Sequence, residues 1–466
     1  MVFGQFNHGK RVYARLGSLL LVCAVLSCVV QRPARSIAAR ADLQNSLNSR
    51  FGVVEAWRAP QQAAAIGVGW ERLTLWWKAL QPDGPNSWNA FATGHDGYIN
   101  RELAAGRKLA GELINTPDWA AANLSQHGSS IPKGLYLPYD DPQNYWGHFV
   151  SLIAKRYAGR IDDWVLWNEV NIPSGKYSTW KGSVADYAQL VKVAYLAAHR
   201  VNPHARIVLF GDPYWYDHGA FFTKLLDKLA LQPGAAANNG YFDVANVHLY
   251  NRPLDYATII PLYMRLLAQH HLHKPIWISE TNAIPFNDPV RLYPRAGFFA
   301  TLNDQASYIV EAFAIAVSLG VERVEVNRMI DGTDFTAGGE PFGLLRNDMS
   351  ARPAYSAYRT AVQLLSGVTS GRLSVNAVSG VYTVTLHKPG ATITVAWDQT
   401  PLPASVTIPA VSSSATKYTK LGVTHSVHAS SGSYRFPLEP ATGNTDPSNP
   451  KDYVMGGSPL ILVQAS

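Results

Sequence analysis

The sequence predicts an α/β protein, a (β/α)8 TIM barrel followed by an all-β sandwich. The chain has 466 residues, 47% apolar and 16% charged, so it is globular and longer than one core usually supports. Between about residues 50 and 366, short apolar runs alternate with longer amphipathic stretches; from Gly367 on, helical periodicity ends and Ser, Thr, Val and Gly dominate. We expect a leader at 1–41, the barrel at 42–366 and the sandwich at 367–466.

Eight strand-helix units are expected in the barrel region. The expected strands are Val53–Trp57, Glu71–Leu75, Lys108–Ile114, Asp163–Asn168, Arg206–Phe210, Phe242–Leu249, Pro275–Ser279 and Val321–Val326. Amphipathic spacing predicts helices that include Gln143–Tyr157, Val184–Val201 and Tyr355–Leu365. In the last hundred or so residues, alternation of period two predicts strands such as Val381–His387 and Thr392–Trp397.

The leader has the pattern of an export signal. A basic segment precedes an apolar run, Leu16–Val30, which as a helix would reach about 22 Å, less than the roughly 30 Å of a bilayer core. Ala39–Ala41 suits a signal peptidase, Val25–Cys28 is an imperfect lipoprotein box, and the basic residues after the run suit a retained anchor. Cleavage, lipidation at Cys28 and membrane anchoring stay open, and we expect an exported protein, periplasmic or extracellular.

Charge and cysteine content exclude several classes of protein. The formal charge of the chain is +7, but the leader has no acid and six basic residues, which are Lys10, Arg11, Arg15, Arg32, Arg35 and Arg40. The rest of the chain therefore has a net charge of about +1, which is too little for a nucleic-acid-binding surface. Both cysteines, Cys23 and Cys28, also lie there. The body therefore has no disulfide, thiolate metal site or cysteine nucleophile. No metal-ligand spacing or phosphate-binding glycine loop occurs, so we expect no metal, cofactor or nucleic-acid partner.

The chemistry is expected at the ends of two strands. In the segment Asp163–Asn171, an apolar strand stops at Asn168 and Glu169. In the segment Pro275–Asn282, another apolar strand stops at Glu280. Strands four and seven of a barrel both open at its C-terminal mouth, where barrel enzymes keep their sites. Either glutamate alone could be a solvated loop residue. Together they form the carboxylate pair that glycoside hydrolysis needs.

These motifs resemble those of the retaining glycoside hydrolases of clan A, and within it family 39, which includes β-xylosidases and endoglycosidases of bacterial exopolysaccharide operons. Trp167–Asn171 resembles the Trp-Asn-Glu-Pro-Asn acid/base motif, and Ile278–Glu280 resembles the nucleophile strand. Further family-like segments occur in order along the chain: Gly69–Arg72, Thr116–Ala120, His248–Tyr250, Phe342–Leu345, Arg352–Tyr355 and Gly456–Pro459. The chain departs from the pattern at Val170, where proline is usual, and at Asn327-Arg328, which replace an aromatic platform.

The resemblance implies a role for each matching residue. Glu169 would be the acid and later the base, and Glu280 the nucleophile. Arg72 and Tyr250 would hold Glu280 in its charged form, and Asn168 would bind the sugar 2-hydroxyl. For Arg72 and Tyr250 a purely structural role stays open.

Aromatic residues are expected to bind the sugar faces. Trp119, Trp215 and Trp277 are assigned to the substrate site because they lie at strand ends or in loops, with Tyr214 and Tyr216 beside Trp215. The tryptophans expected in the core are Trp76, Trp77, Trp146, Trp164 and Trp167. His248 is expected either to contact substrate or to orient its neighbours.

The sequence therefore predicts a retaining glycoside hydrolase acting on a β-linked poly- or oligosaccharide. An endo-acting exopolysaccharide hydrolase is the preferred interpretation, because the Tyr214–Tyr216 cluster suits a polymer groove. The alternatives are an exo-acting β-xylosidase, a transglycosidase with the same residues, and a non-catalytic carbohydrate-binding protein. We expect a monomer, and a separation of roughly 5 to 5.5 Å between the two carboxyl groups.

Overall fold

The computed structural model describes residues 49–92, 96–175, 177–286, 288–290, 300–332, 341–441, 445–446 and 449–465. These residues belong to one compact unit. The predicted leader, and parts of the loops after the seventh and eighth predicted strands, lie outside the described residues. Within the described ranges, no helix combines the length and the apolar character that crossing a membrane requires.

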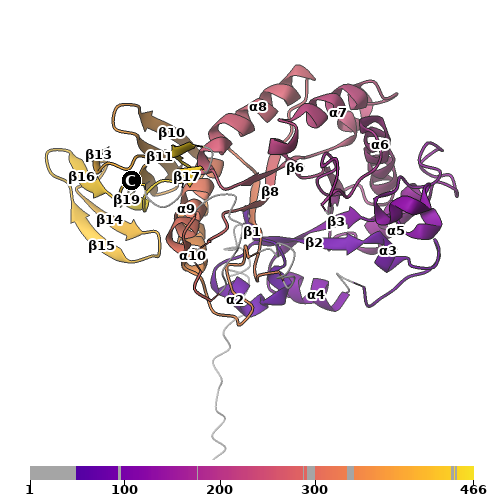
Figure 1. Ribbon diagram of the computed structural model, residues 1–466, viewed down its shortest axis with the longest axis horizontal. Coiled ribbons are helices and arrows are strands. Elements are labelled where there is room, and N and C mark those ends of the chain that lie inside the picture. The colour runs from indigo at the N-terminus through magenta and orange to yellow at the C-terminus, as the bar shows by residue number, and fades with distance from the viewer. Residues whose placement is uncertain are drawn as a thin grey trace, which may run out of the picture. The chain divides into compact units, whose positions relative to one another are not determined.

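A parallel sheet of nine strands forms the barrel, in the order β5-β4-β3-β2-β1-β9-β8-β7-β6. Figure 1 labels β1, β2, β3, β6 and β8 of this sheet. A parallel bridge between Val208 and Val244 joins the β5 edge to the chain just before β7 and so closes the ring. The strands are β1 (Phe51–Val53), β2 (Trp70–Trp76), β3 (Lys108–Ile114), β4 (Asp163–Leu166), β5 (Arg206–Val208), β6 (Asp212–Pro213), β7 (Ala245–Tyr250), β8 (Ile276–Asn282) and β9 (Arg323–Val326). The predicted TIM-barrel class is confirmed.

Helices follow the strands on the outside of the barrel. They are α2 (Pro60–Ala65), α3 (Trp77–Leu80), α4 (Asp96–Ala104), α5 (Tyr145–Arg156), α6 (Val184–Val201), α7 (Ala220–Ala230), α8 (Tyr256–Gln269), α9 (Leu302–Ser318) and α10 (Pro353–Leu365). The start of α6 is set by a capping box, in which Ser183 Oγ accepts from the Asp186 amide at 3.2 Å and Asp186 accepts from the Ser183 amide at 2.8 Å. This helix has the predicted bounds.

The first predicted strand is displaced. It was expected at Val53–Trp57, but β1 covers Phe51–Val53. Glu55 adopts a left-handed conformation with φ 57°, which ends the extended run, and a 3₁₀ turn follows at Ala56–Arg58. This shift brings Glu55 to the mouth of the barrel instead of into a strand.

The chain after α10 forms antiparallel sheets, which confirms the predicted sandwich class. One sheet has six strands, in the order β10-β11-β12-β19-β14-β15, and two short sheets pair β13 with β16 and β17 with β18. The strands are β10 (Ser370–Asn376), β11 (Val381–Lys388), β12 (Ala391–Asp398), β13 (Ala404–Pro409), β14 (Ser414–Thr419), β15 (Thr424–His428), β16 (Ser433–Leu438), β17 (Thr445–Asp446), β18 (Asn449–Tyr453) and β19 (Leu460–Ala465). A separate apolar cluster joins the six-stranded sheet to β13 and β16.

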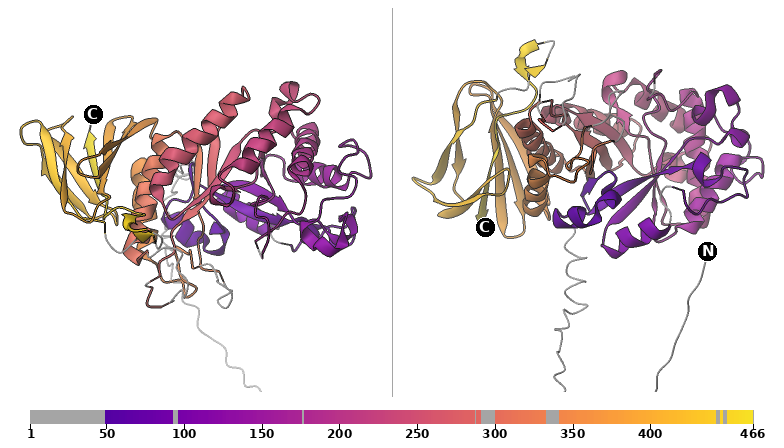
Figure 2. Two further views of the ribbon diagram at one scale, coloured as in Figure 1. Left: turned by 45° about the horizontal axis from the view of Figure 1, so that its top comes forward. Right: turned by 60° about the horizontal axis from the view of Figure 1, so that its bottom comes forward.

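Helix α9 links the barrel to the C-terminal sheets (Figures 1 and 2). Every side chain from Asp304 to Val317 is buried, because one side of α9 faces the barrel and α10 while β10 and β11 cover the other. Polar contacts also join α9 to the C-terminal region: Lys420 Nζ donates to Ser307 Oγ at 2.8 Å, and the Gly456 amide donates to Glu311 at 3.2 Å.

Candidate active site

A cavity of about 570 Å³ opens at the carboxyl ends of the barrel strands. Glu169, three residues after β4, and Glu280, in β8, both line it. One carboxylate oxygen of each and one ring nitrogen of His248 all lie within 4.8 Å of one another. The structure therefore brings together the two glutamates that the sequence singled out.

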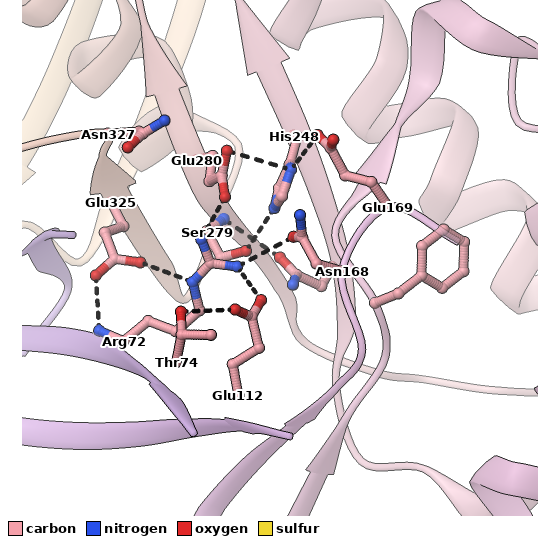
Figure 3. A network of polar contacts seen from close by, with 12 residues as sticks. Arg72, Thr74, Glu112, Asn168, Glu169, His248, Ser279, Glu280, Glu325 and Asn327 are labelled. Carbon is pink, nitrogen blue, oxygen red and sulfur yellow. Dashed lines mark hydrogen bonds and ion pairs between the residues drawn. The ribbon is translucent and has the colours of Figure 1, made fainter. Parts of the chain in front are cut away.

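Glu280 is surrounded by groups that favour its charged form (Figure 3). Arg72 donates to its Oε1, the Tyr250 hydroxyl donates to its Oε2 at 2.6 Å, and His248 Nδ1 lies 3.6 Å from Oε2. Burial alone would raise the pKa of Glu280, but the positive charges of His248 and Arg72 and the two hydrogen bonds lower this pKa to about 2. Glu280 is therefore ionised at neutral pH, as a nucleophile must be.

Arg72 is buried in β2 and is shared among three carboxyl groups (Figure 3). It donates to Glu112 of β3 as well as to Glu280, its backbone amide donates to Glu325 of β9 at 2.9 Å, and its Nε lies 3.8 Å from the same carboxyl. Burial raises the pKa of Glu325 to about 8 and also raises the pKa of Glu112. With Glu325 protonated at neutral pH, the charge of Arg72 is left for Glu112 and Glu280.

Glu169 reaches the cavity from a left-handed turn. Its φ is 46°, and Trp167 two residues earlier has φ 69°. The turn points the Glu169 carboxylate at His248, whose Nδ1 lies 2.8 Å from Glu169 Oε1. The Glu169 side chain is 17% exposed, so it stays accessible to a ligand in the cavity.

His248 bridges the two glutamates from β7 (Figure 3). Its side chain is fully buried, and its Nε2 contacts Ser279 Oγ at 3.1 Å. Burial lowers the pKa of His248, but the charge of Glu280 and the hydrogen bond and charge of Glu169 more than offset this, so the pKa is raised. The ring packs on Gly211, where a Cβ would lie 1.8 Å from Nε2, so only glycine fits there. This geometry lets His248 orient its neighbours; the ring also lines the cavity, so contact with substrate stays a prediction.

Asn168 lines the cavity between Arg72 and Glu169. Its Oδ1 lies 3.4 Å from the Arg72 Nη1, a group that can only donate, so the Asn168 amide nitrogen is turned away from Arg72 and can donate to a ligand hydroxyl.

The two ends of the cavity differ in chemistry. One end carries exposed aromatic rings, Tyr177, Trp215 and Tyr216, which are 44%, 51% and 55% exposed. Burial, and then the charge of Glu169, raise the pKa of Tyr216, and Glu169 lines the same cavity as these rings. The other end carries the ion pair of Arg328 with Glu55. Arg328 belongs to the Asn327-Arg328 pair that replaces the aromatic platform of the family 39 pattern.

Glu169, His248 and Glu280 would also be the donors for any divalent cation at this site. The Arg72 guanidinium already neutralises Glu280, and the His248 Nδ1 that faces the two carboxylates is already hydrogen-bonded to Glu169. The donor set therefore suits proton transfer better than cation binding.

Two predicted substrate residues lie elsewhere. Trp277 is fully buried at the opposite end of β8, in the bottom layer of the barrel, where it packs against Trp70 at 5.2 Å and donates to Glu322 at 2.6 Å. Its position near the start of the strand rules out the assigned sugar contact. Trp119 is half-buried against Trp77, donates to the Gln81 carbonyl at 2.7 Å, and is not among the residues that line the cavity.

Several residues of the site were missed, among them Trp76, Glu112, Glu325 and Tyr177. Trp76 was assigned to the core, but it is the last residue of β2, is 37% exposed and lines the cavity. Glu112 and Glu325 were not singled out, although each is an acid inside an otherwise largely apolar barrel strand. An acid at such a position must find a buried cation or be protonated, which is the signal that could have identified them.

The fold and the carboxylate pair define a class: TIM barrels with an acidic pair at the mouth and a C-terminal β-sandwich. No protein-family model matches this sequence, and no curated protein matches it either. The chain is similar in fold to a family 39 glycoside hydrolase from the gut symbiont Bacteroides cellulosilyticus WH2, with a TM-score of 0.67 and 15% identity over 90% of this chain and 82% of that one.

Two further solved structures share the fold. A GH30 endoxylanase from Clostridium papyrosolvens C71 matches with a TM-score of 0.59 and 13% identity, over 90% of this chain and 96% of that one. A monomeric β-xylosidase from Caulobacter crescentus CB15 matches with a TM-score of 0.57 and 15% identity, over 90% and 95%. At the level of the fold, these structures confirm the resemblance to glycoside hydrolases that the sequence predicted.

Proposed function

We propose that this protein is a retaining glycoside hydrolase that cleaves β-glycosidic bonds of a poly- or oligosaccharide by double displacement. The observation that carries the proposal is the ionised Glu280 facing Glu169, with oxygens of the two carboxylates within 4.8 Å. Retaining enzymes place their two carboxyl groups roughly 5 to 5.5 Å apart, whereas inverting enzymes need roughly 6.5 to 9.5 Å to admit a water.

In the first step, a Glu280 oxygen attacks the anomeric carbon while the bond from that carbon to the leaving oxygen breaks. Glu169 gives its proton to the leaving oxygen. Because His248 contacts Glu169 Oε1, the second oxygen of Glu169 is left to carry that proton. The amide nitrogen of Asn168 donates to the sugar 2-hydroxyl, a contact that strengthens in the transition state.

In the second step, Glu169 is a carboxylate and removes a proton from an incoming water. The water oxygen forms a bond to the anomeric carbon, and the bond to Glu280 breaks and returns its electron pair to the carboxylate. Arg72 and Tyr250 stabilise Glu280 as the leaving carboxylate through the hydrogen bonds that they already make to it. Two inversions give net retention.

We further propose endo cleavage of an exported polymer, such as a bacterial exopolysaccharide. Exposed aromatic rings beside Glu169 support this choice, because stacking surfaces beyond the cleaved bond are useful only when the chain continues past it. The export pattern of the leader supports a location in the periplasm or outside the cell, with membrane anchoring open.

An exo-acting β-xylosidase is the second candidate. The shared fold with the Caulobacter crescentus β-xylosidase favours it, and the monomeric state of that enzyme agrees with the monomer expected here. A non-catalytic carbohydrate-binding protein is less well supported, because such a protein has no use for an ionised Glu280 opposite Glu169.

The test uses the purified full-length protein with a panel of polysaccharides and aryl β-glycosides. NMR of the first product should show the β-anomer, and product lengths should include intermediate oligosaccharides. A 2-deoxy-2-fluoro glycosyl fluoride of the accepted sugar should attach covalently to Glu280, with Glu280→Gln as the unlabelled control. An α-anomer as first product, or no turnover of any substrate, would contradict the proposal. Release of monosaccharide as the sole product would favour the exo-acting β-xylosidase over endo cleavage.

A further inference from the structure

The turn that carries Glu169 is held in an uncommon conformation. Trp167 and Glu169 both have positive φ values, 69° and 46°, in a region that side chains with a Cβ rarely adopt. Such a turn persists only when contacts on its two sides fix it. The position of the Glu169 carboxylate therefore depends on the residues that anchor the turn.

The side before Glu169 is anchored by Thr179. The Trp167 indole donates to the Thr179 carbonyl at 2.8 Å, and the Thr179 hydroxyl donates to the Asn168 carbonyl at 2.5 Å. Through these two contacts Thr179 holds Trp167 and Asn168, the two residues before Glu169. The residues after Glu169 are held by other groups.

The side after Glu169 is anchored by Asp212. Asn171 Nδ2 donates to Asp212 Oδ1 at 3.0 Å, and the Ile172 amide closes the turn by donating to the Glu169 carbonyl at 3.1 Å. Asp212 is fully buried in β6 and is itself fixed by the Tyr263 hydroxyl of α8, which donates to Oδ2 at 2.5 Å. Asp212 is not among the residues that line the cavity, so it makes no contact with a ligand there, and its hydrogen-bonded link to the turn runs through Asn171. Its charge is also felt at His248.

We propose that Asp212 is a positioning residue of the reaction, which holds the Glu169 carboxylate on His248 through its hydrogen bond to Asn171. This inference rests on the proposed role of Glu169 as the acid. Without Asp212, Asn171 loses its anchor, the turn relaxes toward ordinary φ values, and the proton donor moves away from the leaving oxygen. Glu280 keeps Arg72 and Tyr250, so the nucleophile is unaffected.

The kinetic test exploits this separation. Aryl β-glycosides with 2,4-dinitrophenyl, 4-nitrophenyl and phenyl leaving groups need increasing help from the acid. For Asp212→Ala we expect kcat/KM to stay within about 3-fold of wild type on the dinitrophenyl substrate and to fall about 10- to 100-fold on the phenyl substrate. Asn171→Ala should behave alike, and the double variant should lose little more than either single one.

Two variants serve as matched controls. Asp212→Asn keeps an oxygen that can accept from Asn171, and the Tyr263 hydroxyl can accept from the new amide, so we expect near wild-type kinetics on all three substrates. Asp163→Ala removes a buried carboxylate at the other end of β4, where it pairs with Arg323 at 2.9 Å, and should lower all three rates equally through stability alone. An equal loss across leaving groups for Asp212→Ala would overturn the inference.

A crystal structure of Asp212→Ala gives a readout that does not depend on activity. We expect the 2.8 Å contact between Glu169 and His248 to be lost while Glu280 keeps Tyr250. If Glu169 stays on His248, Asp212 has no positioning role, even if the protein hydrolyses none of the glycosides. Wild-type inactivity alone would count against the proposed function instead.

Discussion

Single residues divide the chemistry of this cavity between two carboxyl groups. Glu280 is kept ionised by Arg72, Tyr250 and His248, whereas Glu169 contacts only His248 among the described side chains. Glu280 is therefore held as an anion. Glu169 keeps one carboxylate oxygen without a hydrogen bond to His248, and this oxygen can carry a proton. This asymmetry makes different predictions for their replacement.

The first prediction concerns Glu280 and Glu169. Glu280→Gln should abolish turnover of every substrate, because no covalent intermediate can form. Glu169→Ala should lose about 10²- to 10⁴-fold on poor leaving groups but still react with dinitrophenyl glycosides, and azide should rescue it with formation of a β-glycosyl azide. Steady-state kinetics and NMR of the azide product check this. Equal losses on activated and unactivated substrates for both variants would contradict the division of roles.

The second prediction concerns Tyr250. Tyr250→Phe removes the 2.6 Å hydrogen bond to Glu280, and kcat/KM should fall about 10- to 100-fold. The reaction needs ionised Glu280, so activity is lost as pH falls through the pKa of Glu280. Loss of the hydrogen bond raises that pKa from about 2, so the acidic limb of the pH profile should move to higher pH. Tyr308→Phe is the control: it loses hydrogen bonds to the Leu249 carbonyl, Thr281 Oγ1 and the Tyr256 hydroxyl but none to Glu280, so it should leave the limb in place.

At the level of elements, each functional side chain comes from the carboxyl end of a strand or the loop after it. The loop after β6 forms a 3₁₀ turn, Tyr214–Tyr216, in which Tyr214 packs inward against Tyr263 while Trp215 and Tyr216 stay exposed. The inward ring fixes the turn, and the outward rings are free to stack on a sugar.

The third prediction tests this turn. Trp215→Ala should weaken polymer hydrolysis about 10-fold or more and leave hydrolysis of a small aryl glycoside nearly unchanged, because only the polymer reaches past the cleaved bond. Phe91→Ala, which removes a ring that is 92% exposed outside the cavity, should affect neither substrate. The ratio of kcat/KM on polymer to kcat/KM on aryl glycoside is the quantity to compare, and an unchanged ratio for Trp215→Ala would remove the support for endo action.

Sequence patterns predicted those elements whose signals are local. The bounds of α6 were predictable because apolar periodicity and the capping pair Ser183 and Asp186 agree. The position of β1 was not, since Glu55 leaves the strand through a left-handed turn that its sequence does not demand. Contacts between distant side chains could not be predicted from local sequence patterns. Arg72 and Glu280 are 208 residues apart in the sequence, and only the closed barrel brings them together.

The same limit explains the errors among the tryptophans. Trp277 and Trp76 both lie in apolar strands, and their assignments weighed residue type above position along the strand. Trp277 is near the start of β8 and fills the bottom of the barrel, while Trp76 is at the end of β2 and faces the cavity. Strand direction in the barrel, rather than residue type, decides which of the two can touch a ligand.

On the scale of the whole molecule, the central strands of the six-stranded sheet, β12 and β19, are largely buried, whereas the outer strands β10 and β15 are largely exposed. One face of the sheet packs on α9 and joins the barrel core, and the other packs on β13 and β16. The boundary with α9 contains the buried Glu311, and burial raises its pKa to about 8. Lys420 is buried at the same boundary, and burial lowers its pKa to about 8.

The fourth prediction follows from Glu311. An unfolded glutamate releases its proton near pH 4.3, but Glu311 keeps its proton in the folded state up to about pH 8, so the free energy of unfolding should fall as pH rises between these values. Glu311→Gln keeps an acceptor for the Gly456 amide and removes this dependence. We expect it to raise the free energy of unfolding by on the order of 4 kcal/mol at pH 8 and by about 1 kcal/mol at pH 5.

Urea denaturation at the two pH values checks this prediction. Lys420 remains mostly charged in the unfolded state at both, and its own contribution changes chiefly above pH 8, where its folded and unfolded pKa values differ. Glu322→Gln, in a partly exposed glutamate whose pKa is lowered by ion pairing, is a suitable control and should not stabilise the protein at pH 8. A Glu311→Gln variant no more stable than wild type at pH 8 would contradict the buried, protonated state.

The complete burial of α9 has a consequence for how the chain is made. During synthesis the barrel strands up to β9 and helix α10 emerge first, and one side of α9 can dock on them, but β10 and β11 that cover its other side leave the ribosome later. Until then the nascent chain presents an apolar helix surface to the cell, which invites chaperone capture or aggregation. A chain that stops after Leu365 would keep this surface of α9 exposed. Covering α9 is therefore a structural role of the C-terminal sheets in the folded protein.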